Sequence, residues 1–214
     1  MENKLDFITI RKFLLKLSDE IMHNKDYLNE LDAECGDGDF GVGMYIGFRD
    51  VMMVTNQQED KDIGDLFVKV GDAILSSVGG ASGPLFGTFF IEAGKRVAGK
   101  GEIDLGDLLS MFSSSLEKIK LRGGADIGDK TLVDALHPAV ESLRESVVLR
   151  LGIIEALENA AKAAEVGCFE TRKLNAKRGK ARYLGQQTLG HIDPGAEVVK
   201  LIFKTLYEVC SFSS

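Results

Sequence analysis

Three aspartates and four glycines fall within the fourteen residues LDAECGDGDFGVGM, 31–44. Asp32, Asp37 and Asp39 would repel one another if the chain brought them together, so their close spacing needs a reason. Carboxylate oxygens are preferred ligands of hard divalent cations, and Mg²⁺ usually shares its coordination sphere with substrate phosphates. Two interpretations are open: a magnesium site on a tight turn, or a solvated acidic turn in which Asp37 or Asp39 caps a helix.

Three other segments have the residue types that such a site would need. Residues 77–88, SVGGASGPLFGT, place small residues before a helix start, where backbone amides attract anions. Residues 122–136, RGGADIGDKTLVDAL, again combine glycines with acids, and six Lys or Arg side chains lie between Arg172 and Arg182. A bound anion would explain these features, and ordinary turns and a solvated basic loop are the alternatives.

Apolar residues recur at helical spacing over almost the whole chain, which predicts about eight helices. The last of them would begin with Asp193 as N-cap and Pro194 as the first helical residue. No convincing pair of strands is expected, which argues against Rossmann and P-loop folds, because both need a parallel sheet. We therefore predict one all-α domain over residues 1–214, in which the four segments above connect helices.

Composition limits the class of protein. The chain is 44% hydrophobic and 28% charged, as is usual for a globular protein, and its net charge of −7 argues against a nucleic-acid partner. No apolar run reaches the roughly 18 residues of a membrane span, and the N-terminus does not resemble a signal peptide. The three cysteines are far apart and odd in number, as expected of reduced thiols. We expect a cytoplasmic protein without a membrane partner.

Taken together, the segments resemble the nucleotide-binding L subunit of dihydroxyacetone kinases, the DhaL family. The shared motifs are GDGD after a Leu-Asp pair, GGASGPLFGT, GDKT followed by DAL, and YLG leading to GHIDPGA. They occur in family order from Asp32 to Ala196. The resemblance implies a closed barrel of about eight antiparallel helices, with the nucleotide site at one end and with two Mg²⁺ ions bound to the aspartates.

The resemblance also assigns roles to residues of this chain. The metal ligands would be Asp32, Asp37 and Asp39. The residues along the phosphates of ADP or ATP would be Phe40, Gly41, Val42, Gly43, Gly80, Ala81 and Ser82. Gly123 and Leu132 would border the adenine and ribose, either Arg178 or Lys180 would cover the nucleotide, and Asp193, Pro194 and Gly195 would close the pocket. No side chain is assigned as a catalytic group.

Two positions depart from the family pattern. Many members have a histidine at the position of Phe40, and an arginine is common at the position of Lys180. A phenylalanine cannot donate a hydrogen bond to a phosphate, and a lysine replaces a bidentate fork by a point charge. The expected phosphate contacts therefore differ in detail from those of the family.

The resemblance implies a phosphotransferase subunit that passes a phosphoryl group, through a magnesium-bound nucleotide, to dihydroxyacetone held by a K subunit. In the commoner bacterial form ADP stays bound and is rephosphorylated by a phosphohistidine-carrying M subunit of the phosphotransferase system, and we expect this form. The alternatives are a subunit that exchanges ATP directly, a nucleotide-binding regulatory scaffold such as a transcription coactivator, and a purely structural helical bundle.

Overall fold

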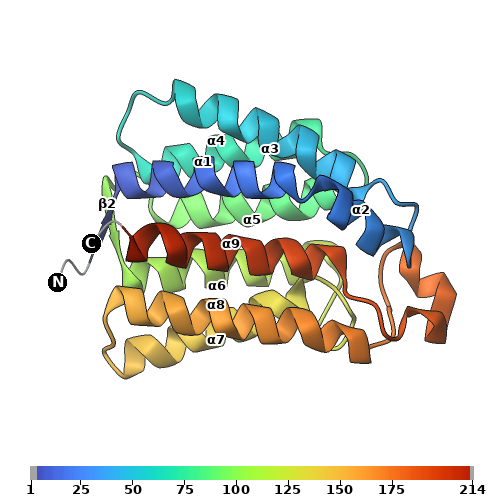
Figure 1. The fold of residues 1–214 in the computed structure, drawn as a ribbon. Coiled ribbons are helices and arrows are strands. Elements are labelled where there is room, and N and C mark those ends of the chain that lie inside the picture. The colour runs from blue at the N-terminus through green and yellow to red at the C-terminus, as the bar shows by residue number, and fades with distance from the viewer. Residues whose placement is uncertain (1–3, 213–214) are drawn as a thin grey trace.

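The computed structural model describes residues 4–212, and most of them lie in helices (Figure 1). Eight long α-helices and one short one are found in these residues. Their bounds are α1 Phe7–His23, α2 Lys25–Ala33, α3 Phe40–Gln57, α4 Ile63–Ser77, α5 Ser82–Arg96, α6 Leu105–Gly123, α7 Val133–Val148, α8 Ile153–Glu170 and α9 Pro194–Ser211. Two 3₁₀ helices, η1 Thr171–Lys173 and η2 Lys180–Thr188, lie in the last connection.

The long helices form a closed ring. Each packs against the next in the order α1, α3, α4, α5, α6, α7, α8 and α9, and α9 packs against α1 to complete the ring. Neighbouring helices run in opposite directions along the barrel (Figure 1). The short α2 continues beyond α1 after a break at Asn24. The predicted all-α barrel of about eight antiparallel helices is therefore confirmed.

A row of contacting phenylalanine side chains fills the interior of the helical barrel. Phe48, Phe67, Phe89, Phe90, Phe112 and Phe203 are at most 2% exposed. Successive contacting rings have centroids 4.9–6.3 Å apart, in edge-to-face, tilted and stacked arrangements. Full burial of one such side chain stabilises a fold by roughly 1.5–3 kcal/mol, so these rings contribute substantially to the stability of the barrel.

The prediction that no strand pair would form was wrong. β1, Lys4–Asp6, pairs antiparallel with β2, Glu102–Asp104, and places Leu5 opposite Ile103. Both central side chains are buried, at 5% and 0% exposure. Three residues are too few to show an alternating pattern in a sequence, which is why the pair could not be recognised.

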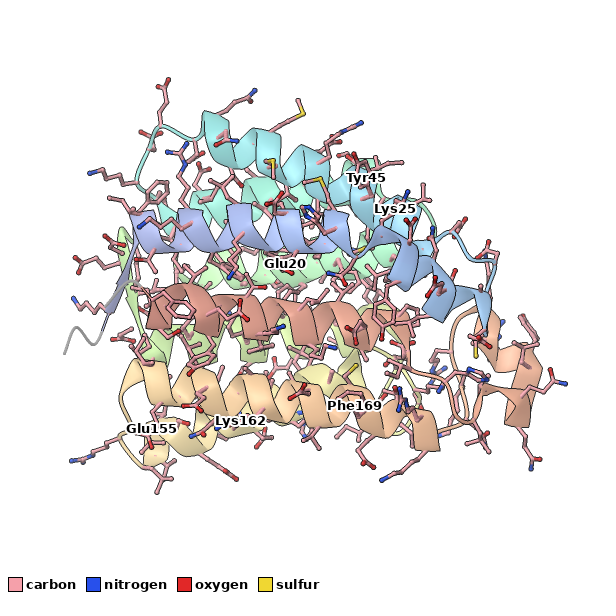
Figure 2. The ribbon with its side chains drawn as sticks, in the orientation of Figure 1. Glu20, Lys25, Tyr45, Glu155, Lys162 and Phe169 are labelled. Atoms are coloured by element: carbon pink, nitrogen blue, oxygen red, sulfur yellow. The ribbon has the colours of Figure 1, made fainter. Side chains whose placement is uncertain are left out.

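The connections at one end of the barrel are the four segments that the sequence singled out. The loops 34–39, 78–81, 124–132 and 171–193 all follow helices that run toward the same end, on the right in Figure 1. Charged side chains such as Glu155 and Lys162 of α8 cover the outside of the barrel (Figure 2). Over residues 4–212, no helix has the length and apolar character that crossing a bilayer requires.

Candidate functional site

The three aspartates meet at this end of the barrel. Asp32 lies in the last turn of α2, and Asp37 and Asp39 lie in the loop before α3. One carboxylate oxygen from each lies within 4.8 Å of the others. Asp37 and Asp39 are exposed and Asp32 is half-buried. Three convergent carboxylates with open access suit a hard divalent cation that keeps positions for water or phosphate.

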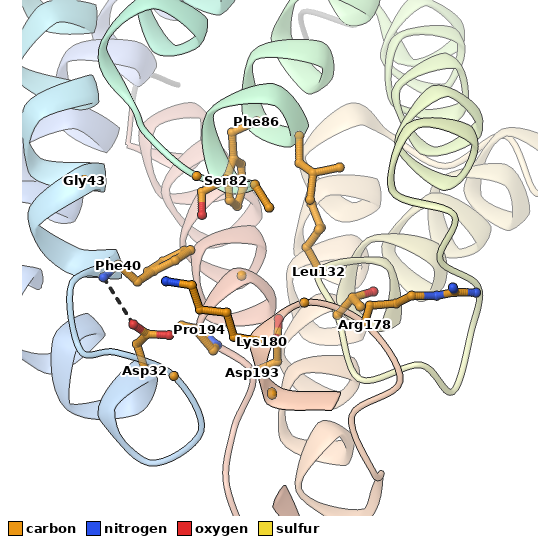
Figure 3. Close-up of a pocket in the computed structure, with 18 of the residues that line it drawn as sticks. Asp32, Phe40, Gly43, Ser82, Phe86, Leu132, Arg178, Lys180, Asp193 and Pro194 are labelled. Carbon is orange, nitrogen blue, oxygen red and sulfur yellow. Dashed lines mark hydrogen bonds between the residues drawn. The ribbon is translucent and has the colours of Figure 1, made fainter. Parts of the chain in front are cut away.

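Backbone amides hold the carboxylate of Asp32. Its Oδ2 accepts the N–H groups of Gly38 at 2.9 Å, Asp39 at 3.2 Å and Phe40 at 3.4 Å (Figure 3 shows the bond to Phe40). A Cβ on Gly36 would lie 2.2 Å from Oδ1 of Asp32, so the loop can pass the carboxylate only with a glycine there. The acidic loop is therefore fixed by its own backbone around one of its acids.

A cavity of about 820 Å³ opens beside the aspartates. All four connections at this end contribute to its walls. Of the residues assigned by resemblance, the following line it: Asp32, Asp37, Asp39, Phe40, Val42, Gly43, Gly80, Ala81, Ser82, Gly123, Leu132, Arg178, Lys180, Asp193, Pro194 and Gly195. The structure thus brings together, around one cavity, residues that span most of the chain.

Gly41 differs from the rest of that set, because it lies outside the cavity lining. It is buried where α3 crosses α2, and a Cβ on it would lie 2.0 Å from the carbonyl oxygen of Lys25. The family resemblance placed it along the phosphates together with Phe40, Val42 and Gly43. In the structure it allows two helices to approach closely, which is a packing role.

The loop between α4 and α5 forms the wall opposite the basic segment. Gly80 has a φ of +66°, and a Cβ there would meet no atom within 4 Å. Ser82 begins α5 and lies beside Phe86 at the cavity (Figure 3). The first amides of a helix are free of intrahelical partners and can bind an anion. This wall therefore offers a helix start at the cavity, and the phosphate role assigned to it stays a prediction.

The basic segment between α8 and α9, residues 172–192, is called the flap below. Lys180 contacts the carboxylate of Asp37, whereas Arg178 points away from the aspartates (Figure 3). The Nε of Arg178 instead donates to Asp129 at 3.1 Å. The hydrogen bond with Lys180 lowers the pKa of Asp37, and the same contact raises the pKa of Lys180. Of the two candidates left open by the sequence, Lys180 is the one on the aspartate side.

Asp193 lines the cavity at the start of α9. As predicted, it caps the helix, with its Oδ2 accepting the N–H of Ala196 at 2.8 Å, and Pro194 is the first helical residue. Burial raises the pKa of Asp193 to about 7, although the amide of Ala196 and the charge of Lys130 act in the opposite direction. The carboxyl therefore gains a proton far more readily than an exposed aspartate.

Eighteen further residues line the cavity, and none of them was assigned individually from the sequence, although most lie in the four segments singled out there. They are Cys35, Gly36, Ile46, Ser77, Val78, Gly79, Pro84, Leu85, Phe86, Ile119, Arg122, Ala125, Lys130, Thr131, Ala176, Gly179, Ala181 and Ile192. Leu85, Phe86, Ile119 and Leu132 make one part of the cavity apolar, as a base-binding slot requires. Burial raises the pKa of the Cys35 thiol, which keeps it protonated and a poor ligand for a hard cation.

Comparison with known proteins agrees with this geometry. The family model of the DAK2 domain matches residues 34–208. The ADP-binding subunit DhaL of the PEP-dependent dihydroxyacetone kinase of Escherichia coli K12 is 41% identical over 197 residues, which are 92% of this chain and 94% of that protein. The corresponding DhaL of the PTS-dependent kinase of Lactococcus lactis is 35% identical over 201 residues, 94% and 96% of the two chains. This chain belongs to the DhaL family.

A solved structure carries the same fold within a longer chain. The crystal structure of the dihydroxyacetone kinase from C. freundii in complex with AMP-PNP and Mg²⁺ superposes with a TM-score of 0.71 at 29% identity. The match covers 93% of this chain and 33% of that one. The family resemblance drawn from the motifs is confirmed, and with it the assignment of the chain as a dihydroxyacetone kinase subunit of the DhaL type.

Proposed function

We propose that this chain holds a magnesium-bound adenine nucleotide and uses it to transfer a phosphoryl group to dihydroxyacetone presented by a K subunit. The main observation in support is the cluster of Asp32, Asp37 and Asp39 at the edge of a cavity of about 820 Å³. The cavity has an apolar part for a base and a helix start for phosphates. Support also comes from the names of the relatives, which describe ADP-binding subunits, and from the AMP-PNP and Mg²⁺ in the C. freundii complex.

The donor set fits magnesium. Three carboxylates supply hard oxygen ligands, and the contact between Lys180 and Asp37 shows that the cluster already draws a cationic group. We propose that Asp32, Asp37 and Asp39 bind two Mg²⁺ ions together with the nucleotide phosphates. When bound, the ions would neutralise charge on the phosphates and polarise the transferring group. Phosphoryl transfer depends mainly on such positioning and charge stabilisation, so no protein nucleophile is required.

Other residues of the chain then bind and orient the nucleotide. The amides at the start of α5 and the hydroxyl of Ser82 would take the phosphates, and Lys180 would add a positive charge from the flap. Phe40 would contribute an apolar wall at a position where a histidine could donate a hydrogen bond. The base and ribose would lie against Leu132 and Gly123. The cavity would be closed at the start of α9 by Asp193, Pro194 and Gly195.

We further propose that the phosphate comes from a phosphohistidine-carrying M subunit, with ADP retained as a cofactor, in a cytoplasmic complex. Support comes from the relatives at 41% and 35% identity, whose names call the kinase PEP-dependent and PTS-dependent. Direct exchange of ATP from solution is the alternative source of phosphate for the same site.

Reconstitution tests this function. The chain is mixed with a matching K subunit and dihydroxyacetone, and then receives either ATP alone or phosphoenolpyruvate with the phosphotransferase proteins. We expect triose phosphate only in the second mixture, and none when the K subunit is left out. An Asp39→Asn variant is the matched control and should be inactive. Turnover with ATP alone would refute the retained-cofactor form, and turnover without the K subunit would overturn the subunit assignment.

A further inference from the structure

The flap reaches the cavity with very little buried surface of its own. Among residues 172–192, only Ala176, Thr188 and Ile192 are buried. The N–H of Ala176 donates to Oγ1 of Thr188 at 3.0 Å, and the N–H of Gly190 donates to the carbonyl of Arg172 at 2.8 Å. A segment with so few buried contacts opens easily unless groups outside it hold it in place.

Lys130 supplies such a group from another part of the chain. It lies in the loop between α6 and α7, and its Nζ donates to the carbonyl oxygen of Thr171 at 2.7 Å and to that of His191. Thr171 is where α8 ends and the flap begins, and His191 is where the flap returns to α9. One ammonium group therefore bridges the two ends of the flap.

Lys130 is in an energetically unfavourable position for two reasons, the burial of its charge and its backbone conformation. The residue is only 4% exposed, and burial lowers the pKa of its ammonium group, because the charged form loses its hydration. Its backbone has a φ of +59°, in the left-handed region that lysine seldom adopts. Strained residues persist where the surroundings fix them, and they cluster at functional sites.

The turn around Lys130 is built to hold it there. One carboxylate oxygen of Asp134 accepts the N–H of Gly128 at 2.6 Å, and the other accepts that of Thr131 at 2.8 Å. The neighbouring Asp129 binds the middle of the flap, since its carboxylate accepts from Lys177 at 3.2 Å and from Arg178. Two consecutive residues of one turn thus contact the base and the middle of the flap.

We propose that Lys130 is a positioning residue that clamps the base of the flap and thereby sets how long a nucleotide stays in the cavity. The clamp itself follows from the contacts of the chain alone. The effect on residence time rests on the function proposed above. In this arrangement the flap moves as a lid, its two ends remain joined through Lys130, and Lys180 is kept close to the aspartates.

Hydrogen–deuterium exchange of the full chain without ligand tests the clamp. Lys130→Met removes both hydrogen bonds, and we expect exchange in peptides covering 171–176 and 188–193 to rise about tenfold, with α1 to α6 unchanged. Lys130→Arg keeps the charge and the donors, so it should restore most of the protection. Lys177→Met is the matched control, because Asp129 keeps Arg178, and its flap should exchange within about twofold of the wild type.

A second readout follows the bound nucleotide. The dissociation rate of magnesium-ADP from Lys130→Met should rise about tenfold, with the association rate changed by less than about twofold. Unchanged flap exchange in Lys130→Met would overturn the clamp. So would an equal loss of protection throughout the barrel, or failure of both Lys130 variants to fold, because Lys130 would then support the whole fold. If the wild type binds no ADP, the proposed function fails, and the exchange result still decides the clamp.

Discussion

The two sides of the cavity are held in place by different means. The aspartate side, residues 32–43, is fixed locally: three amides of the loop bind Asp32, and α3 packs directly on α2 through Gly41. The flap side, residues 172–192, is mostly exposed and depends on charged groups of distant segments, namely Asp37, Asp129 and Lys130. The first side is held by its own backbone, as the proposed cation site requires. The second is tethered, and in the proposed clamp it opens without disturbing the barrel.

Because of this difference, we expect the two sides to control different properties of ligand binding, namely the affinity and the rates of entry and exit. A preorganised carboxylate cluster determines whether a metal and its phosphates bind, because little ordering remains to be done on binding. A tethered flap determines how quickly the ligand enters and leaves. Substitutions on the aspartate side should therefore have larger effects on affinity than those on the flap.

The largest effect is expected from the exposed aspartates. Asp37→Asn or Asp39→Asn removes one ligand from a site that bridges metal and phosphate, and we expect magnesium-ADP affinity to fall by at least about 100-fold. The helical circular dichroism should not change. Asp126→Asn is the control, because Asp126 is an exposed acid at the same end that pairs with Lys120 at 2.7 Å. Calorimetric titration measures all three, and undiminished binding in the first two would refute the metal assignment.

The next largest loss of magnesium-ADP affinity is expected from the loop between α4 and α5, where the phosphates are proposed to bind. Gly80→Val places a branched side chain at the cavity and should weaken magnesium-ADP more than Ser82→Ala, which removes one hydrogen bond to a charged group worth about 1.5–3 kcal/mol. Gly99→Val is the control for backbone strain. Gly99 also has a positive φ (+80°) and open space around it, but it lies at the other end of the barrel. If Gly80→Val and Gly99→Val bind nucleotide equally well, the 78–81 loop is only a turn.

On the flap, Lys180→Met should reduce magnesium-ADP affinity about tenfold, because one positive charge near the phosphates is lost. The effect should shrink as salt rises. Lys177→Met removes the same charge from a side chain that pairs with Asp129, and it should change affinity by no more than about twofold. Equal losses in both variants would mean that the flap acts only through its overall charge.

The sequence predicted the aspartate side better than the flap side for a physical reason. Asp32, Asp37 and Asp39 lie within eight residues, so local turn geometry alone could bring them together. Asp129 and Lys130 act on residues more than 40 positions away, and nothing in the sequence distinguishes a buried lysine from a solvated one. Helical periodicity likewise predicted about eight helices, and the family resemblance implied that they close into a barrel. The packing role of Gly41 and the three-residue strand pair could not be predicted, because they depend on tertiary contacts.

The smallest effect concerns stability without ligand. Because burial raises the pKa of Asp193 to about 7, the folded chain keeps a proton that the unfolded chain loses above pH 4 or so. Stability due to this group therefore falls as pH rises from about 4 to about 7. Asp193→Asn keeps a capping oxygen without the charge, so at pH 8 it should be more stable than the wild type by the order of 1–3 kcal/mol in urea unfolding.

Asp6 provides the control of opposite sign for this experiment. It caps α1 in the same way, but hydrogen bonds from Thr9 lower its pKa. Its contribution is present above the unfolded pKa and is lost as pH falls, so Asp6→Asn should bring no gain at pH 8. An Asp193→Asn variant with the same pH dependence as the wild type would show that the pKa of Asp193 is not raised in the folded chain.

The dependence of ADP binding on magnesium tests the central claim most directly. Calorimetric titration of the wild-type chain with ADP is carried out once with saturating Mg²⁺ and once with EDTA. Since the aspartates alone would repel the phosphates, we expect binding with Mg²⁺ and a loss of at least about 100-fold in affinity with EDTA. Equal affinity under both conditions would contradict the assignment of Asp32, Asp37 and Asp39 as ligands of the metal that holds the nucleotide.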